Sequence, residues 1–426
     1  MQVLKEEFNK RQYDLKAIIP KGNIAILIIS RCIASAGNIA LAFLPIYFTS
    51  LGGTVLQYGI ITVFATLIGV PSTIMGGAMT YGHSLKKIVV MTSWLGPSVL
   101  IGYYFSHSWT VLCIPILLGA AGSLGSVATR QLVADATIQE NRTAQLSLYQ
   151  TLIAIPSIVT PLVGGYLVHT LGTVEGFRLG ILIALAISPI PIILLVKYLR
   201  QSNQDTTTKR EDSTRSFNLV LDRYRNFYSN LALLPRVLVS LLVVYASVIV
   251  ANSMINPFLI FYATNIAKLD TFQWGMILSM QVLFANIART PLGMLSDRFD
   301  KRKVLLVSVI ATAPLPVFLA FENSFWAILG IMLAMVAAGI NYRPTHEALQ
   351  IELTPRQKRP ALFVIYDILT NFCTSAGTLI GALLFTISYT IPFYSFTMIE
   401  IFAAVILALS FFRQKETKTH VGLISR

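Results

Sequence analysis

Long apolar runs constrain the fold of this 426-residue chain more than any other feature. A helix needs about 20 apolar residues to cross a bilayer, and inside lipid it must satisfy its own backbone polar groups. Twelve such runs lie at about 22–49, 55–80, 88–106, 109–134, 144–170, 177–198, 235–263, 271–296, 303–322, 325–351, 360–388 and 391–412. The sequence therefore predicts an all-α polytopic membrane protein with twelve transmembrane helices in the lipid bilayer.

The composition argues against a water-soluble enzyme. Apolar residues make up 55% of the chain and charged residues only 12%, whereas soluble globular proteins carry about 25% charged residues. The three cysteines lie inside apolar runs without CxxC or histidine companions, so no metal site is predicted. The sequence also has no Walker loop, GxSxG or HExxH motif, and we predict neither a cofactor nor an enzymatic activity.

The positive charges are distributed very unevenly along the chain. Of the 33 Lys and Arg residues, 27 lie in the N-terminal segment, in the loops after the even-numbered runs, and in the C-terminal segment. The opposite loops hold only Arg178 and Lys268. By the positive-inside rule, both termini are predicted in the cytosol of a cell-membrane protein. The net charge of +14 then reflects membrane topology, and no nucleic-acid partner is predicted.

A polar stretch in the middle of the chain separates six runs from six. We expect a cytosolic tail over 1–21, a helical bundle over 22–198, a cytosolic linker over 199–234, a second bundle over 235–412 and a cytosolic tail over 413–426. Matching features recur in the two bundles at an offset of 216 or 217 residues, for example Gly77 with Gly293 and Asp135 with Glu352. The repeat predicts two pseudo-symmetric six-helix bundles related by an axis along the membrane normal.

The stretch from Gly293 to Lys303, GMLSDRFDKRK, carries a family signature. It resembles the G-x-x-x-D-R-x-G-R-K-K motif that follows helices 2 and 8 in the major facilitator superfamily. The first-half copy keeps Gly77 and the final lysines but has Tyr81 in place of the aspartate. Twelve predicted helices, the repeat and the central linker extend the resemblance over the whole chain.

The fifth run contains a second element of the same kind. Its residues Thr160, Pro161, Gly164 and Gly165 form a T-P-x-x-G-G sequence, which is similar to the G-P-x-x-G-G element typical of antiporters of that superfamily. The glycine before the proline is missing, as is the arginine usually found upstream of the glycines in helix 4. The resemblance therefore points to an antiporter with departures from the usual pattern.

The resemblance also implies a gate at the cytosolic face. We hypothesise that acids and bases at the ends of helices 2, 4, 8 and 10 pair across the halves and hold the outward-open state closed. The alternative is that they are only topogenic positive charges and solvated acids. The gate candidates are Gly293, Asp297, Arg298, Arg302 and Glu352 in the second half and Lys86, Lys87, Asp135 and Arg142 in the first.

Charged residues inside the runs are the strongest candidates for a substrate site, because each costs about 2.5 to 3.5 kcal/mol to place at a bilayer centre. Arg31 and Arg343 lie about 15 Å and 13.5 Å above the cytosolic ends of helices 1 and 10, at 1.5 Å per residue. In the resembling family these helices line the central cavity. We predict that both arginines grip an anionic or strongly polar substrate, unless neighbouring acids and carbonyl groups merely neutralise them.

Two acids and four neutral side chains complete the predicted site. Glu347 and Asp367 are the candidates for exchanging protons, the predicted coupling ion. The neutral candidates for substrate binding are Asn38, Asn252, Asn256 and Tyr342, each of which could instead bond a neighbouring helix. Glu400, in the middle of helix 12, has no partner that the sequence identifies.

These observations predict a secondary transporter that works by alternating access, as a monomer, on a small-molecule substrate. The leading interpretation is proton-coupled movement of a small organic solute, with export of drug-like compounds slightly favoured by the helix 5 element. The alternative is uptake or exchange of an organic anion or a sugar-like metabolite, favoured by the buried arginines. A more distant alternative is a sensor or enzyme that does not transport.

Overall fold

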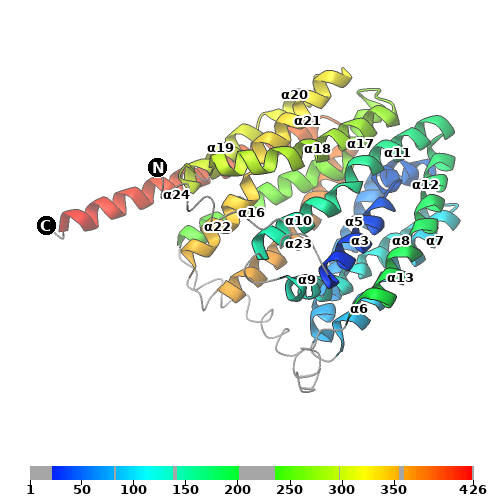
Figure 1. Cartoon of the computed structure of the whole chain (residues 1–426). Coiled ribbons are helices and arrows are strands. Elements are labelled where there is room, and N and C mark those ends of the chain that lie inside the picture. Colours follow the sequence, from blue (N-terminus) through cyan, green and yellow to red (C-terminus); the bar gives the residue numbers. More distant parts are fainter. Residues whose placement is uncertain are drawn as a thin grey trace, which may run out of the picture.

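The computed structural model describes residues 22–80, 83–137, 142–200, 236–296, 298–354 and 359–424, and the regular structure of these residues is helical (Figure 1). The predicted all-α fold is confirmed. Helices of the first half are α3 (Asn23–Ala36), η1 (Leu41–Phe43), α4 (Leu44–Ser50), α5 (Val55–Met79), α6 (Leu85–Ser93), α7 (Leu95–Phe105), α8 (Trp109–Ala120), η2 (Ala121–Ser123), α9 (Leu124–Ala136), α10 (Arg142–Ala154), α11 (Pro156–Leu171), α12 (Thr173–Ile187) and α13 (Pro189–Tyr198). Those of the second half are α16 (Arg236–Ile255), η5 (Asn256–Phe258), α17 (Leu259–Asn265), α18 (Thr271–Ser296), α19 (Lys301–Thr312), α20 (Leu315–Leu319), α21 (Phe325–Gly339), α22 (Tyr342–Leu353), α23 (Arg359–Ile387) and α24 (Ile391–Ile424).

Each predicted span has a helix among the described residues, but one of these helices is less apolar than the others. Ten are long and apolar enough to cross a membrane, and the bent pair Asn23–Ala36 and Leu41–Ser50 makes an eleventh. The twelfth predicted span is α18, which is 26 residues long but contains two glutamines, an asparagine and an arginine that lower its hydropathy. The last helix also continues to Ile424, past the predicted boundary at 412, although its apolar segment ends at Phe411.

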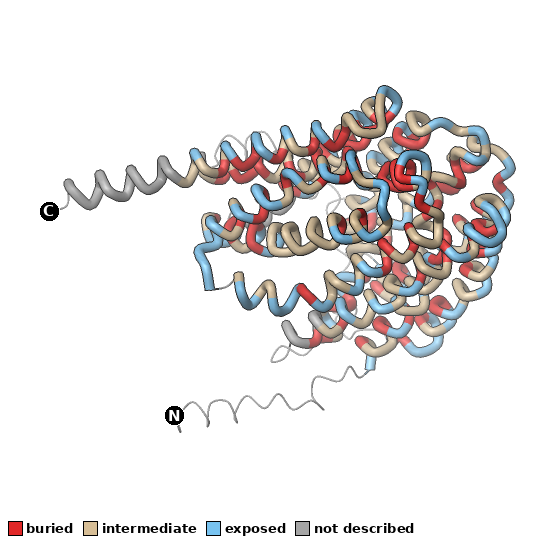
Figure 2. The backbone as a smooth tube through the Cα atoms, turned by 90° about the horizontal axis from the view of Figure 1, so that it is seen from above, coloured by how far each residue is buried: buried red, intermediate tan, exposed pale blue. Residues whose placement is uncertain are grey.

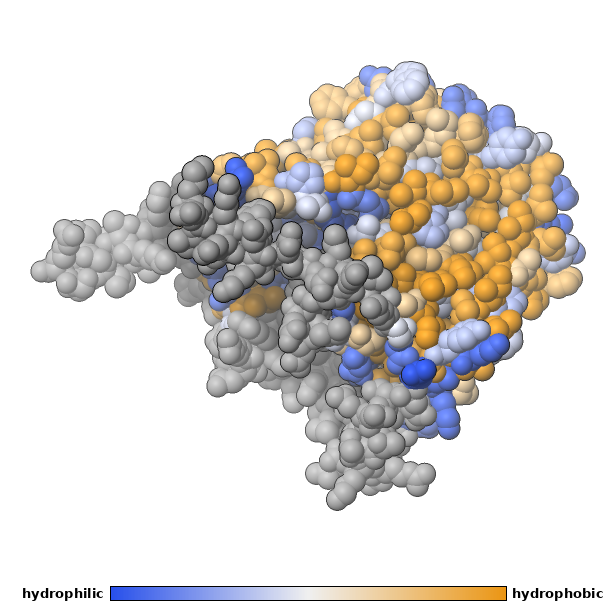
Figure 3. All heavy atoms as spheres, viewed as in Figure 1, coloured by the Kyte–Doolittle hydropathy of each residue, from blue (hydrophilic) through white to orange (hydrophobic). Residues whose placement is uncertain are grey.

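The outer surface fits a lipid environment. Large apolar side chains are widely exposed, among them Trp326 at 75%, Met398 at 73% and Ile387 at 71%. Figure 3 shows a broad hydrophobic surface across the described part of one face, with hydrophilic residues mainly at its margins. Water would not stabilise such a surface, and we infer that these side chains face acyl chains.

Equivalent anchors in the two halves show that they are built on one plan. A short 3₁₀ segment interrupts the first helix of each half, at Leu41–Phe43 and at Asn256–Phe258, 215 residues apart. After it, the Tyr47 hydroxyl donates to the Ser106 carbonyl at 3.1 Å, and the Tyr262 hydroxyl donates to the Glu322 carbonyl at 3.0 Å. Each tyrosine also packs its ring on a phenylalanine of the last helix of its half, Phe177 or Phe393.

The packed cores reveal which end of the molecule is closed. We call the end that carries Lys86, Lys87 and Lys301–Lys303 the basic end. At the opposite end, one core cluster contains buried residues from both halves, including Phe43 and Tyr58 with Phe258 and Phe385. Figure 2 shows buried segments crowded at the end of the bundle that lies away from the C label.

Toward the basic end, each half has a core of its own. One cluster there contains only first-half residues, such as Leu27 and Leu132, and two others contain only second-half residues, such as Leu241 and Leu305. The helices of this end pack within their half, α9 on α5 and α6, and α22 on α19 and α16. The structure is therefore joined at the opposite end and divided at the basic end.

Candidate functional site

A cavity of about 570 Å³ lies inside the first half. Its wall comes from α3, α6, α7, α8, α12 and α13, and every lining residue belongs to the first half. The lining is mostly apolar, and its polar side chains are those of Ser30, Arg31, Ser35, Asn38, Thr92, Ser93, Tyr103 and Ser188. This volume and mixture of side chains are typical of small-molecule sites, in which a few polar groups orient a mainly apolar ligand.

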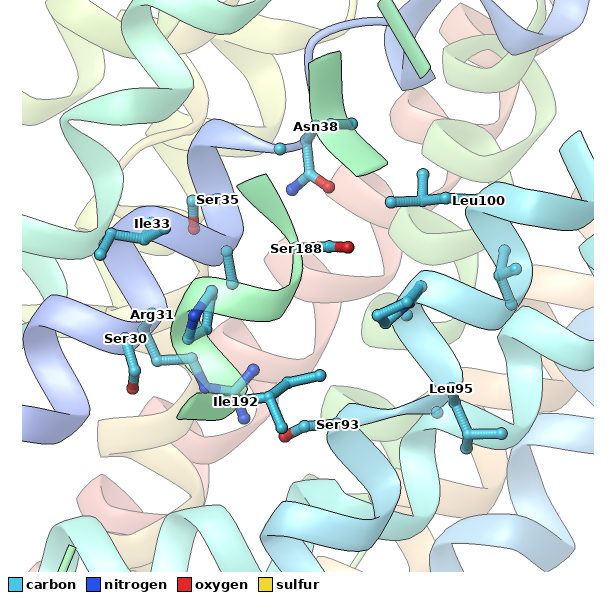
Figure 4. Close-up of a pocket in the computed structure, with 18 of the residues that line it drawn as sticks. Ser30, Arg31, Ile33, Ser35, Asn38, Ser93, Leu95, Leu100, Ser188 and Ile192 are labelled. Atoms are coloured by element: carbon cyan, nitrogen blue, oxygen red, sulfur yellow. The ribbon is translucent and has the colours of Figure 1, made fainter. Parts of the chain in front are cut away.

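Arg31 is the charged residue of this cavity. Its Nη2 atom donates a 2.8 Å hydrogen bond to Thr129 Oγ1 on α9, and the threonine hydroxyl in turn donates to the Gly125 carbonyl at 2.8 Å. Figure 4 shows the Arg31 side chain extending from α3 among the lining residues. One fixed hydrogen bond leaves other guanidinium N–H groups available to a ligand.

Small residues create the space around the arginine. Gly96 at the start of α7 and Gly122 in η2 line the cavity, and a Cβ atom added at either would meet nothing within 4 Å. Asn38, at the break between α3 and η1, and Ser188, between α12 and α13, also line it (Figure 4). The helix breaks therefore bring polar side chains to a wall that is otherwise apolar.

The second-half candidates do not line this cavity. Asn252 donates from Nδ2 to the Val248 carbonyl of its own helix at 2.9 Å, and Asn256 is exposed at the break between α16 and α17. The Tyr342 hydroxyl is buried within the second half. The ring of Tyr342 stacks on the His346 ring, with the ring centroids 5.7 Å apart. The structure thus separates these three residues from Arg31 and Asn38.

Arg343, Glu347 and Asp367 form a different group together with Arg130. The Arg343 Nε atom donates to Glu347 Oε1 at 2.9 Å in an ion pair whose side chains are 78% and 52% exposed. Asp367 on α23 interacts electrostatically with Arg343 of its own half and with Arg130 on α9 of the first half. The group therefore links the two halves electrostatically, toward the end at which they are divided.

Three of the gate candidates that can be described contact residues of their own halves. Lys86 Nζ donates to the Val196 carbonyl at 2.9 Å, and Glu352 pairs with Lys301 at 2.9 Å. Asp135, Lys87, Arg298 and Arg302 lie at the basic end: the first three are exposed, and Arg302 stands over the Phe411 ring. A Cβ atom at Gly293 would meet nothing within 4 Å. Asp297 and Tyr81 lie outside the described residues, and only the backbone of Arg142 is described.

The helix 5 element forms the contact between the halves. A Cβ atom at Gly165 would lie 2.5 Å from the Thr271 carbonyl oxygen of α18, and one at Gly275 of α18 would clash with the Pro161 carbonyl. Thr271 Oγ1 also donates to the Gly165 carbonyl at 3.2 Å. Gly164 instead faces the Ile39 carbonyl of its own half. Gly165 and Gly275 therefore allow helices of opposite halves to approach closely.

Several polar residues of this site were not identified from the sequence: Ser30, Ser93 and Ser188 line the cavity, and Thr129 accepts the hydrogen bond from Arg31. Thr129, Ser30, Ser93 and Ser188 stand in apolar runs where hydroxyls usually bond the preceding turn of their own helix. All four do so here, to the carbonyls of Gly125, Leu27, Val89 and Leu185 respectively. No spacing rule separates hydroxyls that also line a cavity from those that face lipid.

The fold and these sites define a class of protein: a helical membrane transporter built from two similar halves, joined at one end and divided at the other. The family model described as Major Facilitator Superfamily matches residues 26–264 and 241–423. The chain belongs to this superfamily, and it is a transporter in the membrane.

Individual relatives are distant but extend over most of the chain. A multi-drug resistance efflux pump PmrA homolog of Lactococcus lactis is 22% identical over 363 residues, covering 82% of this chain and 84% of that protein. The multidrug resistance protein MdtG of Enterobacter lignolyticus is 23% identical over 399 residues, 90% of each chain. A bacterial homologue of the iron transporter ferroportin, solved in an inward-facing state, shares the fold with a TM-score of 0.70 at 17% identity, covering 94% of this chain and 99% of that one.

Proposed function

We propose that this protein exports amphipathic, drug-like organic solutes in exchange for protons. The observation that carries the proposal is the cavity of about 570 Å³ in the first half, in which an apolar wall surrounds Arg31, Asn38 and several hydroxyls. The multidrug efflux relatives add support at low identity. The apolar wall would bind the body of a solute, and Arg31 would bind an acidic or strongly polar group on it.

Alternating access follows from the division of the molecule. We place the basic end in the cytosol by the positive-inside rule, so the structure is open inward. The opposite end is held by the contact of α11 with α18 and of α5 with α23, where Gly59 faces Ala382 across the halves. Solute release outside requires these contacts to part while the basic ends meet.

Asp367 is the carboxyl group that we assign to proton exchange at the divided end. Glu347 is already paired with Arg343, whereas Asp367 attracts an arginine on each half. A proton on Asp367 would remove its attraction for Arg130, and thus weaken the link between the halves. Proton binding is therefore coupled to the movement of the two halves that opens the site to one side of the membrane and closes it to the other.

A second candidate function is uptake or exchange of an organic anion. The observation that favours it is Arg31, whose hydrogen-bond partner among the described residues is a hydroxyl rather than an acid. A cation without an acidic partner inside a membrane protein is typical of a site for anions. The two functions differ in the direction of transport and in the apolar size of the solute.

The experiment is transport in proteoliposomes with an imposed pH gradient, using ethidium as a lipophilic cation, laurate as a lipophilic acid, and benzoate and glucose as small hydrophilic solutes. We expect laurate or ethidium to move against its gradient when protons flow the other way. Asp367→Asn is expected to abolish the dependence on the gradient while leaving exchange of solute across the membrane. Uptake of benzoate or glucose down the proton gradient, without movement of the lipophilic probes, would overturn the proposal.

A cavity-filling variant tests the location of the site. Gly96→Val places a larger side chain in open space, so the fold is expected to persist while binding falls by at least tenfold. Gly330→Val is the matched control, because a Cβ atom there also meets nothing within 4 Å and the residue does not line the cavity. Equal transport by the Gly96 and Gly330 variants would place the site elsewhere.

A further inference from the structure

Glu400 is a buried acid that the transport cycle described above does not use. It lies on α24, is only 1% exposed, and its Oε2 atom has no hydrogen-bond partner among the described residues. The Tyr342 hydroxyl on α22 interacts electrostatically with this carboxyl group and is likewise buried without a hydrogen-bond partner in the described part of the chain. Two buried polar groups therefore face the interior of the second half unsatisfied.

The internal repeat shows what this position means. Phe177 and Phe393 are equivalent anchors, 216 residues apart, and seven residues after each stand Ala184 and Glu400. Ala184 lines the cavity of the first half. Glu400 thus occupies the place in the second half that corresponds to the cavity wall.

The second half has an apolar cavity of about 450 Å³ between α19 and α24, and Glu400 does not line it. Thr397, one turn before Glu400, donates from Oγ1 to the Ala313 carbonyl at 2.6 Å and joins α24 to the end of α19. Beside Glu400, the buried residues Ala403, Ala404 and Leu407 belong to the packed core of this half. The acid therefore lies outside this cavity, among buried apolar residues of its half.

The charged groups on the neighbouring helices have other partners or lie at the basic end. Helices α16, α19, α20 and α23 pack against α24. On α19, Lys301 pairs with Glu352, Arg302 stands over Phe411, and Lys303 is exposed at the basic end.

On the other neighbours several titratable groups are engaged, whereas on α23 the buried Tyr366 hydroxyl has no hydrogen-bond partner among the described residues and Cys373 is a free thiol. On α23, Asp367 interacts with Arg130 and Arg343, and on α16 the Tyr245 hydroxyl bonds Thr370 at 3.0 Å. The His346 ring on α22 lies between the Leu241 carbonyl and the Gln350 side chain, which engage both of its nitrogens.

We propose that Glu400 is a proton-binding site of the second half, neutral in this conformation and ionised when the second half repacks during the transport cycle. A buried carboxylate without a cation or a donor costs far more free energy than a buried carboxylic acid, which keeps a proton instead. Tyr342, whose hydroxyl interacts electrostatically with Glu400, is a polar group that could accept from the acid or donate to the carboxylate. The site deepens the proton coupling proposed above.

Infrared spectroscopy of the full-length protein tests the proposal without any transport assay. At pH 7.0 an exposed glutamate is ionised, since its ordinary pKa is about 4.3. Wild-type protein carrying ¹³C-carboxyl glutamate is expected to show a protonated carboxylic acid band that shifts with the isotope and is missing from Glu400→Gln. Tyr342→Phe is expected to shift that band, whereas Glu347→Gln leaves it in place. A difference spectrum that contains only carboxylate bands would overturn the proposal.

Transport supplies the second arm and separates this inference from the proposed function. In proteoliposomes with ethidium or laurate, Glu400→Gln is expected to lower transport driven by a pH gradient at least tenfold and to retain exchange without a gradient. Unchanged gradient-driven transport by Glu400→Gln would contradict a role in coupling. If the wild type itself ignores the pH gradient, proton-coupled export fails, and the infrared band alone decides whether Glu400 binds a proton.

Discussion

The two halves share one plan but place opposite charges inside their bundles. In the first half Arg31 lies sixteen residues before the anchoring Tyr47, and the last helix offers only Ala184. In the second half Ala246 lies sixteen residues before Tyr262, and the last helix offers Glu400. The cation therefore faces a cavity, and the acid is enclosed in a packed interior.

This difference teaches how a duplicated bundle can divide its work. Backbone anchors and close helix contacts are kept in both copies because they hold each bundle together. The interior between the first, third, fourth and sixth helices is free to change, since a few side chains decide whether it is open or filled. We infer that the first half came to hold the solute and the second half the proton.

The largest effect on stability is expected at a close glycine contact that both halves share. Gly164 and Gly381 are equivalent, and a Cβ atom at either would clash with a backbone carbonyl, of Ile39 or Met254 respectively. Gly164→Val and Gly381→Val are each expected to lower the free energy of unfolding by about 3 kcal/mol, since overpacking typically costs 1 to 3. Thermal unfolding in detergent measures this.

The control for those variants is Gly69→Ala. A Cβ atom at Gly69 meets nothing within 4 Å, and the residue lies inside α5. Alanine is favoured over glycine in a helix by about 1 kcal/mol, so this variant is expected to be slightly more stable than the wild type. If only one of the two valine variants loses stability, the halves do not share this contact in the way described.

The next effect concerns the cation of the first half. Arg31→Gln is expected to weaken binding of laurate by about thirtyfold, or 2 kcal/mol, because a hydrogen bond to a charged group contributes about 1.5 to 3 kcal/mol. Thr129→Val removes the one described hydrogen-bond acceptor of Arg31 and is expected to have a smaller effect. Equilibrium binding measures both, and Lys197→Ala, an exposed charge of the same half, is the control.

The acid of the second half is expected to lower stability rather than support it. Replacing a buried, unsatisfied polar group with an apolar one of similar size is neutral or stabilising, so Glu400→Leu is expected to raise the free energy of unfolding by about 1 to 2 kcal/mol. The melting temperature should rise while gradient-driven transport is lost. A clear loss of stability would show that Glu400 holds its bundle together.

The smallest effect is expected at the basic end. Lys301 and Glu352 form an exposed ion pair, with side chains 50% and 62% accessible, and exposed pairs contribute at most about 1 kcal/mol. Lys301→Ala is therefore expected to change stability by less than 1 kcal/mol. A larger change in unfolding, insensitive to added salt, would assign the pair a structural role beyond its exposed position.

Much of the architecture was predictable from the sequence because hydrophobic length and repeat spacing determine it directly. Apolar runs located the helices, and motif pairs at 216 and 217 residues identified the two halves. The least apolar span, α18, is a helix of 26 residues although it contains two glutamines, an asparagine and an arginine. The length of α24 was misjudged, since a helix can continue in water beyond its apolar part.

The site was predicted less completely, because the depth of a residue in the membrane does not determine the direction in which its side chain points. Arg31 and Arg343 were both predicted to bind substrate; Arg31 lines a first-half cavity, whereas Arg343 pairs with Glu347. Which way a side chain points depends on how its helix packs against its neighbours, and residue spacing alone does not record this. The pairing of the acidic gate residues, such as Glu352 and Asp135, with basic gate residues in the outward-open state stays a prediction.

The most direct test of this division of work is solute-induced thermal stabilisation of the wild type, Arg31→Gln and Arg343→Gln, with laurate, ethidium, benzoate and glucose. A ligand present at 100 times its Kd stabilises the folded protein by about 2.7 kcal/mol. We expect laurate to stabilise the wild type and Arg343→Gln by this amount, and Arg31→Gln by only about a third of it. Stabilisation that is lost in Arg343→Gln and kept in Arg31→Gln would place the solute between the halves and contradict the account.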